Sequence, residues 1–241
     1  MTMIKHLVKH EWLRLIKYNL LIASLVVSFI WVIASAFLTY EELMLFLPTI
    51  FLVEASAMTA LLIGAEMYYE KKEHTISSML ISPMSTVDYM VSKVIAHGLN
   101  TLLIFAIMIV GFIFTVDIRL NIFELFLGTV FVASFYVGLG LLLSYFSKDF
   151  TSLLVNYMIM MILFLIPSIL ILAGILPESL INYTKYIPSE ISLRLMSLSL
   201  GEVDWSQAFI DMGITLGATL VMYRFILIPR FKSFASEHLG V

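Results

Sequence analysis

The chain has 241 residues, of which 61% are hydrophobic and 13% are charged, and its mean hydropathy is +1.02. Soluble domains carry about 25% charged residues, so this composition indicates an integral membrane protein. The net charge of −3 and the lack of an extended basic tract exclude a nucleic-acid-binding surface. The sequence contains no cysteine, which excludes disulfides, thiolate metal sites and cysteine nucleophiles.

The first segment, residues 1–18, has the pattern of an interfacial helix. Basic side chains lie on one helical face, and Trp12 lies with aliphatic residues on the other, as in helices that sit at the level of the lipid headgroups. A secretory signal peptide is the alternative, because residues 19–33 could form its apolar core and residues 34–36 resemble a cleavage site. Glu11 and the ordered amphipathicity are unusual for the charged start of such a signal. We therefore expect a retained first span.

Six apolar segments are long enough to cross the membrane, since about 30 Å of hydrocarbon takes roughly 20 helical residues. Lys and Arg set the orientation of such spans, because they are enriched in cytoplasmic loops. With the N-terminus inside, only Arg119, Lys185 and Arg194 of the 14 Lys and Arg residues fall outside. We predict one all-α domain, residues 1–241, in the cell membrane with both termini cytoplasmic. The predicted spans lie near residues 19–38, 43–66, 94–116, 123–146, 151–176 and 208–229.

The only long polar interval on the basic side is residues 66–93. A charged run at its start leads into residues 75–80, where three apolar residues fall on one helical face. This spacing predicts a short amphipathic helix with one apolar side. Its apolar residues are Ile76, Met79 and Leu80.

A proline and a hydroxyl mark the end of this short helix and the start of the next. Ser82-Pro83 should end it, because proline has no backbone N–H and restricts the residue before it. Ser85 then stands three residues before Asp88, a capping-box variant in which Asp replaces the usual Glu or Gln. A second helix is therefore predicted to begin there and to run into the third span.

The polar interval resembles the first cytoplasmic loop of the type-two ABC export permeases, six-span subunits that work with a separate ATPase. The family pattern is a charged run, Gly-Thr, an acidic residue, paired leucines, Thr/Ser-Pro, and then an acid and a lysine at a fixed distance. The chain departs from it at His74, where the family usually has glycine, and at Ser77, where it usually has an acid. The matching positions are Glu70, Lys71, Glu73, Thr75, Leu80, Ser82, Pro83, Ser85, Asp88 and Lys93.

The resemblance implies the membrane half of an ABC exporter that works by alternating access. It implies two permease chains, identical or paired with a sister permease, and two separate ATPase subunits that bind ATP and Mg²⁺ in place of this chain. A small amphiphilic drug, peptide or lipid-like cargo is favoured, because the chain shows no large external domain and no groove for a long polymer. The residues expected to couple to the ATPase are Glu70, Lys71, Glu73, Thr75, Ile76, Met79, Leu80 and Pro83.

The chain itself lacks a nucleotide-hydrolysing motif. No glycine is followed by lysine, so the phosphate-binding loop Gly-x-x-x-x-Gly-Lys-Ser/Thr is absent. The rival class is an intramembrane metalloenzyme or protease that uses His97 and Asn100, one helical turn apart, with Glu54 or the Glu41-Glu42 pair. His-x-x-Asn lacks the two closely spaced histidines of a zincin helix. We therefore expect no metal, and we expect His97 to bond to a neighbouring span.

Glu54 is the acidic residue nearest the middle of a predicted span. An ionisable group at that depth is a functional-site hypothesis by default, because it is costly to hold there. We assign Glu54 to the substrate pathway together with Asn100 and Asn156. The alternative is a protonated carboxyl that hydrogen-bonds a hydroxyl at matching depth, such as that of Ser28 or Ser134.

Two further features bear on packing and on the outer surface. Gly138 and Gly140, and the four-residue spacing of Ser56, Ala60 and Gly64, permit close approach of helices.

The interval 177–207 is rich in apolar residues, which predicts short amphipathic helices that re-enter the membrane or lie on its surface. In the family that the chain resembles, such helices form an external gate, and a lid over lipid at a dimer interface is the alternative.

Overall fold

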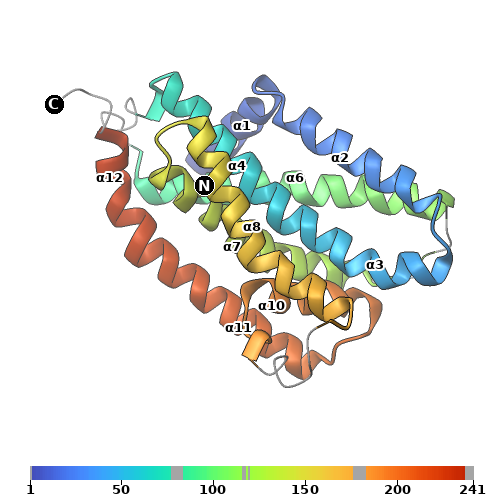
Figure 1. The fold of residues 1–241 in the computed structure, drawn as a ribbon. Helices are drawn as coiled ribbons and strands as arrows, with labels where there is room; N and C mark the ends of the chain where they lie inside the picture. The colour runs from blue at the N-terminus through green and yellow to red at the C-terminus, as the bar shows by residue number, and fades with distance from the viewer. Residues whose placement is uncertain (1, 77–83, 116–117, 119, 176–182, 237–241) are drawn as a thin grey trace.

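The computed structural model describes residues 2–76, 84–115, 118, 120–175 and 183–236, and these contain helices and no strand. The helices form one bundle (Figure 1). In chain order they are α1 (Thr2–Lys17), α2 (Leu20–Ser35), α3 (Tyr40–Val53), η1 (Glu54–Met58), α4 (Thr59–Lys72), α6 (Thr86–Thr115), α7 (Ile122–Phe146), α8 (Phe150–Leu172), α10 (Pro188–Ser197), η2 (Leu198–Leu200), α11 (Trp205–Val221), η3 (Met222–Leu227) and α12 (Ile228–Ser236).

Five described helices are long and apolar enough to cross a membrane, and they coincide with the second to sixth predicted spans. They are Tyr40–Lys72, Thr86–Phe114, Ile122–Phe146, Phe150–Ile171 and Trp205–Ser236. The all-α, multi-pass class predicted from the sequence is therefore confirmed.

The first span differs from its prediction. α2 has 16 residues, which is about 24 Å at 1.5 Å per residue and less than about 30 Å of hydrocarbon. It follows α1 across a bend of 67°, and the bent pair provides the sixth candidate span. α1 itself was predicted to be an interfacial helix, but Glu11 and Leu15 on one of its sides are buried. That side packs on other helices of the bundle, mainly α6.

The second span is a single helix, Tyr40–Lys72, with a π-helical turn at Glu54–Met58. It begins at a capping box in which the Glu42 backbone N–H donates to the Thr39 hydroxyl at 3.3 Å and the Thr39 N–H donates to the Glu42 carboxylate at 2.8 Å. Single π turns inside α-helices are frequent at functional sites. The last span contains a second π turn, Met222–Leu227.

Small residues explain why α4 and α7 pack closely at the centre of the bundle. A Cβ added at Gly140 would lie 2.5 Å from the carbonyl oxygen of Ala60 and would also collide with Ile63. A Cβ at Gly64 would lie 3.2 Å from Leu153 on α8. The close approach predicted at these glycines is confirmed.

The interval between the fifth and sixth spans contains the short helix α10, as predicted. Its Pro188 occupies the first turn, where the missing N–H is tolerated. α10 contacts α3, α7, α8 and α11, so it is wedged among the ends of the spans (Figure 1). Its buried apolar residues are Ile191, Leu195 and Met196.

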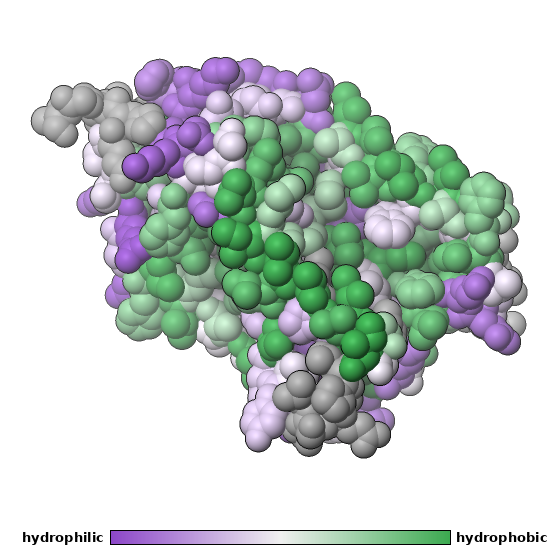
Figure 2. Space-filling view, in the orientation of Figure 1, coloured by the Kyte–Doolittle hydropathy of each residue, from purple (hydrophilic) through white to green (hydrophobic). Residues whose placement is uncertain are grey.

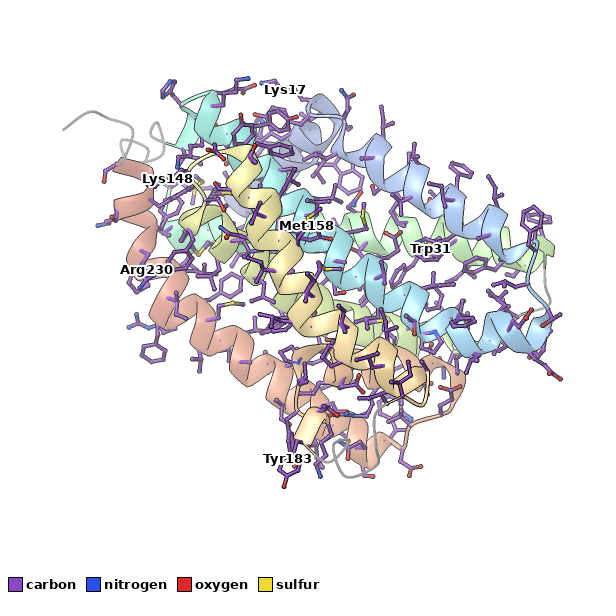
Figure 3. The ribbon with its side chains drawn as sticks, in the orientation of Figure 1. Lys17, Trp31, Lys148, Met158, Tyr183 and Arg230 are labelled. Atoms are coloured by element: carbon purple, nitrogen blue, oxygen red, sulfur yellow. The ribbon has the colours of Figure 1, made fainter. Side chains whose placement is uncertain are left out.

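One end of the bundle is called the basic end. It carries α1, the last turn of α4, the first turns of α6, and α12. Lys17, Lys148 and Arg230 lie on this side of the molecule (Figure 3). Polar residues gather at the basic end, whereas apolar residues cover the face along which α8 runs (Figure 2). Only 6% of the most apolar stretch of α8 is buried, so this helix presents an apolar face to lipid or to another chain.

Candidate functional site: a buried charge cluster beside the polar interval

Three helices meet at the basic end and bring charged side chains together inside the protein. On each helix these residues are three or four positions apart, which places them on one face. We call this set the charge cluster. Its members are Glu11 and Arg14 on α1, Glu66 and Glu70 on α4, and Tyr89, Lys93 and His97 on α6.

Lys93 lies at the centre of the charge cluster and its side chain is completely buried. Its ammonium nitrogen is 2.8 Å from Glu11 Oε2, 2.7 Å from Glu70 Oε1 and 3.2 Å from Glu66 Oε1. Three carboxylates on two other helices therefore share one cation, which fixes the start of α6 against α1 and α4.

The remaining members bind further positions on the same three carboxylates, and Arg14 shares Glu70 Oε1 with Lys93. Arg14 Nη1 is 2.9 Å from Glu11 Oε1 and 2.7 Å from Glu70 Oε1. The Tyr89 hydroxyl donates to Glu70 Oε2 at 2.6 Å, and His97 Nε2 lies 2.7 Å from Glu66 Oε2. The predicted bond from His97 to a neighbouring span is thus confirmed, with Glu66 as its partner.

The charge cluster holds more carboxyl groups than permanent cations. Three carboxyl groups, those of Glu11, Glu66 and Glu70, face Arg14 and Lys93, and His97 lies against Glu66. Removing one partner from such a buried network leaves an uncompensated charge, which typically costs about 3–5 kcal/mol.

A metal ion does not fit the centre of the charge cluster as it is built. Oxygens of Glu11, Glu66 and Glu70 lie within 4.8 Å of one another, a spacing that could serve a cation. The ammonium of Lys93, however, lies within 3.2 Å of all three carboxylates and occupies the position that an ion would need. The protein supplies its own cation here.

The ligand set proposed for the rival metalloenzyme is not brought together. Asn100 pairs with the Ser24 hydroxyl on α2 at 3.5 Å. Glu41 and Glu42 lie in the first turn of α3, and neither they nor Glu54 contacts His97 within the described part of the chain.

The residues predicted to couple to an ATPase separate into an inward and an outward group. Glu70 and Ile76 are buried within this chain, so neither side chain is presented to a second protein in this structure. This corrects the expectation that both lie on the docking surface; Glu70 turns inward because Lys93, Arg14 and Tyr89 bind its carboxylate.

The outward group lies at the end of α4 and just beyond it. Lys71 lies over the ring of Phe234 at 5.1 Å, and the Thr75 hydroxyl donates to the Glu70 carbonyl at 3.0 Å. Glu73 is exposed, and hydrogen bonds from Lys17 and Tyr18 hold its pKa below the usual value. The predicted docking residues Met79, Leu80 and Pro83 lie outside the described residues.

Backbone geometry shows why glycine would suit the position that His74 occupies. α4 ends at Lys72, and His74 has a φ of 57°, in the left-handed region that favours glycine after a helix. Glycine is the residue expected at this position in the family that the interval resembles. The predicted start of the next helix is confirmed, since the Ser85 hydroxyl accepts from the Asp88 N–H at 3.1 Å and donates to its carboxylate at 2.7 Å.

Glu54, assigned from the sequence to the substrate pathway, is buried at the π turn of the second span. The polar side chains near its carboxyl are Trp31 on α2 and Tyr157 on α8. Glu54 Oε1 and Trp31 Nε1 have no hydrogen-bond partner among the described residues. The alternative bond to Ser28 or Ser134 is not found among the described residues, where the two hydroxyls donate to carbonyls of their own helices at 2.8 and 2.6 Å.

The other two residues assigned to the pathway lie elsewhere. Asn100 is buried against Ser24, and Asn156 donates to the Ser147 hydroxyl at 3.0 Å, at the junction of α7 and α8. The structure therefore does not bring Glu54, Asn100 and Asn156 into one site.

A further ion pair, which sequence reasoning missed, fixes α10 to α11. Arg194 Nε and Nη2 lie 2.8 Å from the two carboxylate oxygens of Asp211, and Gln207 donates to the same carboxylate at 3.1 Å. Asp211 is fully buried. The available signal was an acidic residue inside the apolar segment 208–229.

Comparison with known proteins gives one family. The family model described as ABC-2 family transporter protein matches residues 34–228, a range that includes the polar interval and the second to sixth spans. A search of curated proteins finds no match.

Proposed function

Because the chain belongs to the ABC-2 transporter family, we propose that it is the permease subunit of an ATP-driven exporter. In this proposal it moves a small amphiphilic drug, peptide or lipid-like molecule out of the cell by alternating access. Separate ATPase subunits bind ATP and Mg²⁺, consistent with the lack of a Gly-Lys phosphate-binding loop in this sequence. A second copy of the chain, or a sister permease, completes the pathway.

The observation that carries this proposal, beyond the family, is the position of the charge cluster. The polar interval begins in the last turns of α4 and ends in the first turns of α6, and Lys93, its last residue, binds Glu66 and Glu70 and so ties those two helices together. Buried ion pairs in a medium of low dielectric constant resist separation. A force applied to the interval would therefore move α1, α4 and α6 together rather than bend one of them.

The orientation follows from the distribution of charge. Cytoplasmic loops carry an excess of Lys and Arg, so we place the basic end in the cytoplasm of a cell-membrane protein. The ATPase then approaches the polar interval from that side. The exposed apolar side of α8 is the surface offered to lipid or to the second permease chain, and its exposed residues include Met158, Ile159, Ile162 and Leu163 (Figure 3).

The coupling role of the interval is tested by changing its predicted apolar face. Replacing Met79 and Leu80 by Asp should release the ATPase, because burying an unpaired charge in an apolar contact costs several kcal/mol. The matched control replaces the adjacent Ser77 and Ser78 by Asp, which adds the same charge off that face. The readouts are co-purification of the ATPase and transport by the complex. Normal transport by the Met79 and Leu80 double variant would place the docking surface elsewhere.

A further inference from the structure

An apolar groove runs along the basic half of the bundle between α6 and the last span. Its volume is about 420 Å³, within the range of roughly 300–1,000 Å³ for small-molecule sites. α7 forms its floor at Ser134, where the Tyr223 hydroxyl donates to the Ser134 carbonyl at 3.4 Å. The walls are aliphatic and are formed by Val87, Met90, Val91, Val94, Ile95, Leu216, Leu220 and Ile228.

The aliphatic walls select the kind of molecule that can occupy the groove. Val91 and Ile95 on one wall and Leu220 on the other are exposed although they lie on membrane-spanning helices. None of the described residues that line the groove is acidic. A hydrocarbon chain would be accepted by these walls, whereas a hydrated polar ligand would lose its water without gaining hydrogen bonds.

Arg224 is the one permanently charged side chain among the described residues of the lining. It is exposed, and it makes no ion pair or hydrogen bond with the described residues. Arg230, by contrast, lies over the Phe146 ring at 5.3 Å. Arg224 is one helical turn from Ile228 at the mouth and two turns from Leu216 at the deep end. A guanidinium in this place presents a planar fork of donors that matches phosphate.

We propose that this groove binds an anionic phospholipid from the leaflet at the basic end, with its phosphate on Arg224 and an acyl chain along the wall toward Leu216. The charge of Arg224 matches the phosphate of such a molecule, and the aliphatic walls match its acyl chain. An Arg within a membrane span is costly unless it is paired or reaches the interface, and a lipid phosphate would pair with Arg224. This proposal concerns a lipid bound from the bilayer, and its test uses the chain without cargo and without ATPase, so it goes beyond the function proposed above.

The test measures which lipids the full chain retains. The protein is exchanged into mixed micelles that contain equal amounts of phosphatidylglycerol and phosphatidylethanolamine, and bound lipid is counted by native mass spectrometry. The wild type should retain one phosphatidylglycerol in preference to phosphatidylethanolamine. Arg224→Gln should weaken that retention at least tenfold. Arg230→Gln removes another exposed cation of the same span, which is not among the described lining residues, and should leave the retention of phosphatidylglycerol unchanged.

A second variant tests the contribution of the apolar groove to lipid binding separately from that of the Arg224 charge. Ile95→Trp fills the wall while keeping Arg224, and it should also abolish selective retention, with the thermal unfolding temperature as the check on folding. Equal retention of the two lipids by the wild type, or equal loss in both Arg variants, would overturn the proposal. Because the chain has no native cysteine, Val91→Cys offers another check. Efficient disulfide cross-linking between two copies at that position would show that a second chain covers the groove instead.

Discussion

The Lys93 ammonium lies 2.7 Å from Glu70 Oε1, although the two residues are 23 positions apart and both side chains are completely buried. The pair closes the base of the polar interval, because Glu70 is in the last turns of α4 and Lys93 is in the second and third turns of α6. Buried ion pairs contribute little net stability compared with apolar packing. We therefore interpret the pair of Lys93 and Glu70 as a rigid connection that holds α4 and α6 in fixed relative positions.

Removing the Lys93 ammonium should lower the stability of the fold more than removing an exposed lysine does. Lys93→Met leaves three buried carboxylates with one fewer cation, and we expect it to destabilise the fold by about 3–5 kcal/mol. Thermal unfolding of the purified protein, followed by tryptophan fluorescence, measures the effect. The control is Lys148→Met, which removes an exposed lysine at the same end. Equal unfolding temperatures for the two variants would contradict the charge cluster as described.

Packing of α4 on α7 should be sensitive to a single methyl group. In Gly140→Ala the new Cβ would lie 2.5 Å from a backbone oxygen of Ala60, which cannot move aside as a flexible side chain can. Overpacking of this kind costs about 1–3 kcal/mol. Gly98→Ala places its methyl in open space and should instead be neutral or stabilising. If both alanine variants unfold alike, the close approach of the helices is not confirmed.

The left-handed turn after α4 predicts a substitution that stabilises the protein. His74→Gly removes the steric cost of a side chain at a φ of 57°, and a gain of about 1 kcal/mol is expected. His10→Gly, made in the middle of helix α1, should lose about as much because glycine disfavours helices. Opposite shifts in unfolding temperature support the backbone geometry, and a loss in both variants would argue against it.

Glu54 provides the functional prediction within the membrane. Its unpartnered carboxyl oxygen at the π turn is costly to keep there unless it is used. Glu54→Gln preserves shape and hydrogen bonding while it removes the titratable proton. We expect impaired transport with normal assembly and normal basal ATPase activity of the complex, whereas Glu41→Gln, exposed in the first turn of α3, should transport as the wild type does. Wild-type transport by the Glu54 variant across a range of pH would leave only a structural role.

Much of the fold could be predicted from the sequence because the spans and the helix caps depend on residues that are close together in the sequence. Long apolar runs specify membrane helices whatever surrounds them, so the second to sixth spans were predicted close to their observed positions. Caps are local as well, and the Ser85 and Asp88 pair was predicted from a spacing of three. The first span was less accurate: its start next to Asn19 was predicted, but α2 ends at Ser35, three residues before the predicted end at residue 38.

The charge cluster could not be predicted because it depends on which helices meet. Spacing places Glu66 with Glu70 and Lys93 with His97 on common helical faces, but it does not say that the two faces oppose each other. Glu11 was noticed only as unusual for the charged start of a signal peptide, and the structure shows that it binds Lys93. The same limit applies to Glu70, which was expected on the outside with its charged neighbours.

The central claim is that this chain is a permease subunit that works only with a separate ATPase. The most direct measurement is to purify the tagged chain from its native membranes in mild detergent, identify its companions by mass spectrometry, and assay the preparation before and after the companions are stripped away. The account predicts that a subunit with a phosphate-binding loop co-purifies and that ATP hydrolysis disappears when it is removed. Chelator-sensitive proteolysis by the chain alone, abolished by His97→Ala, would contradict it.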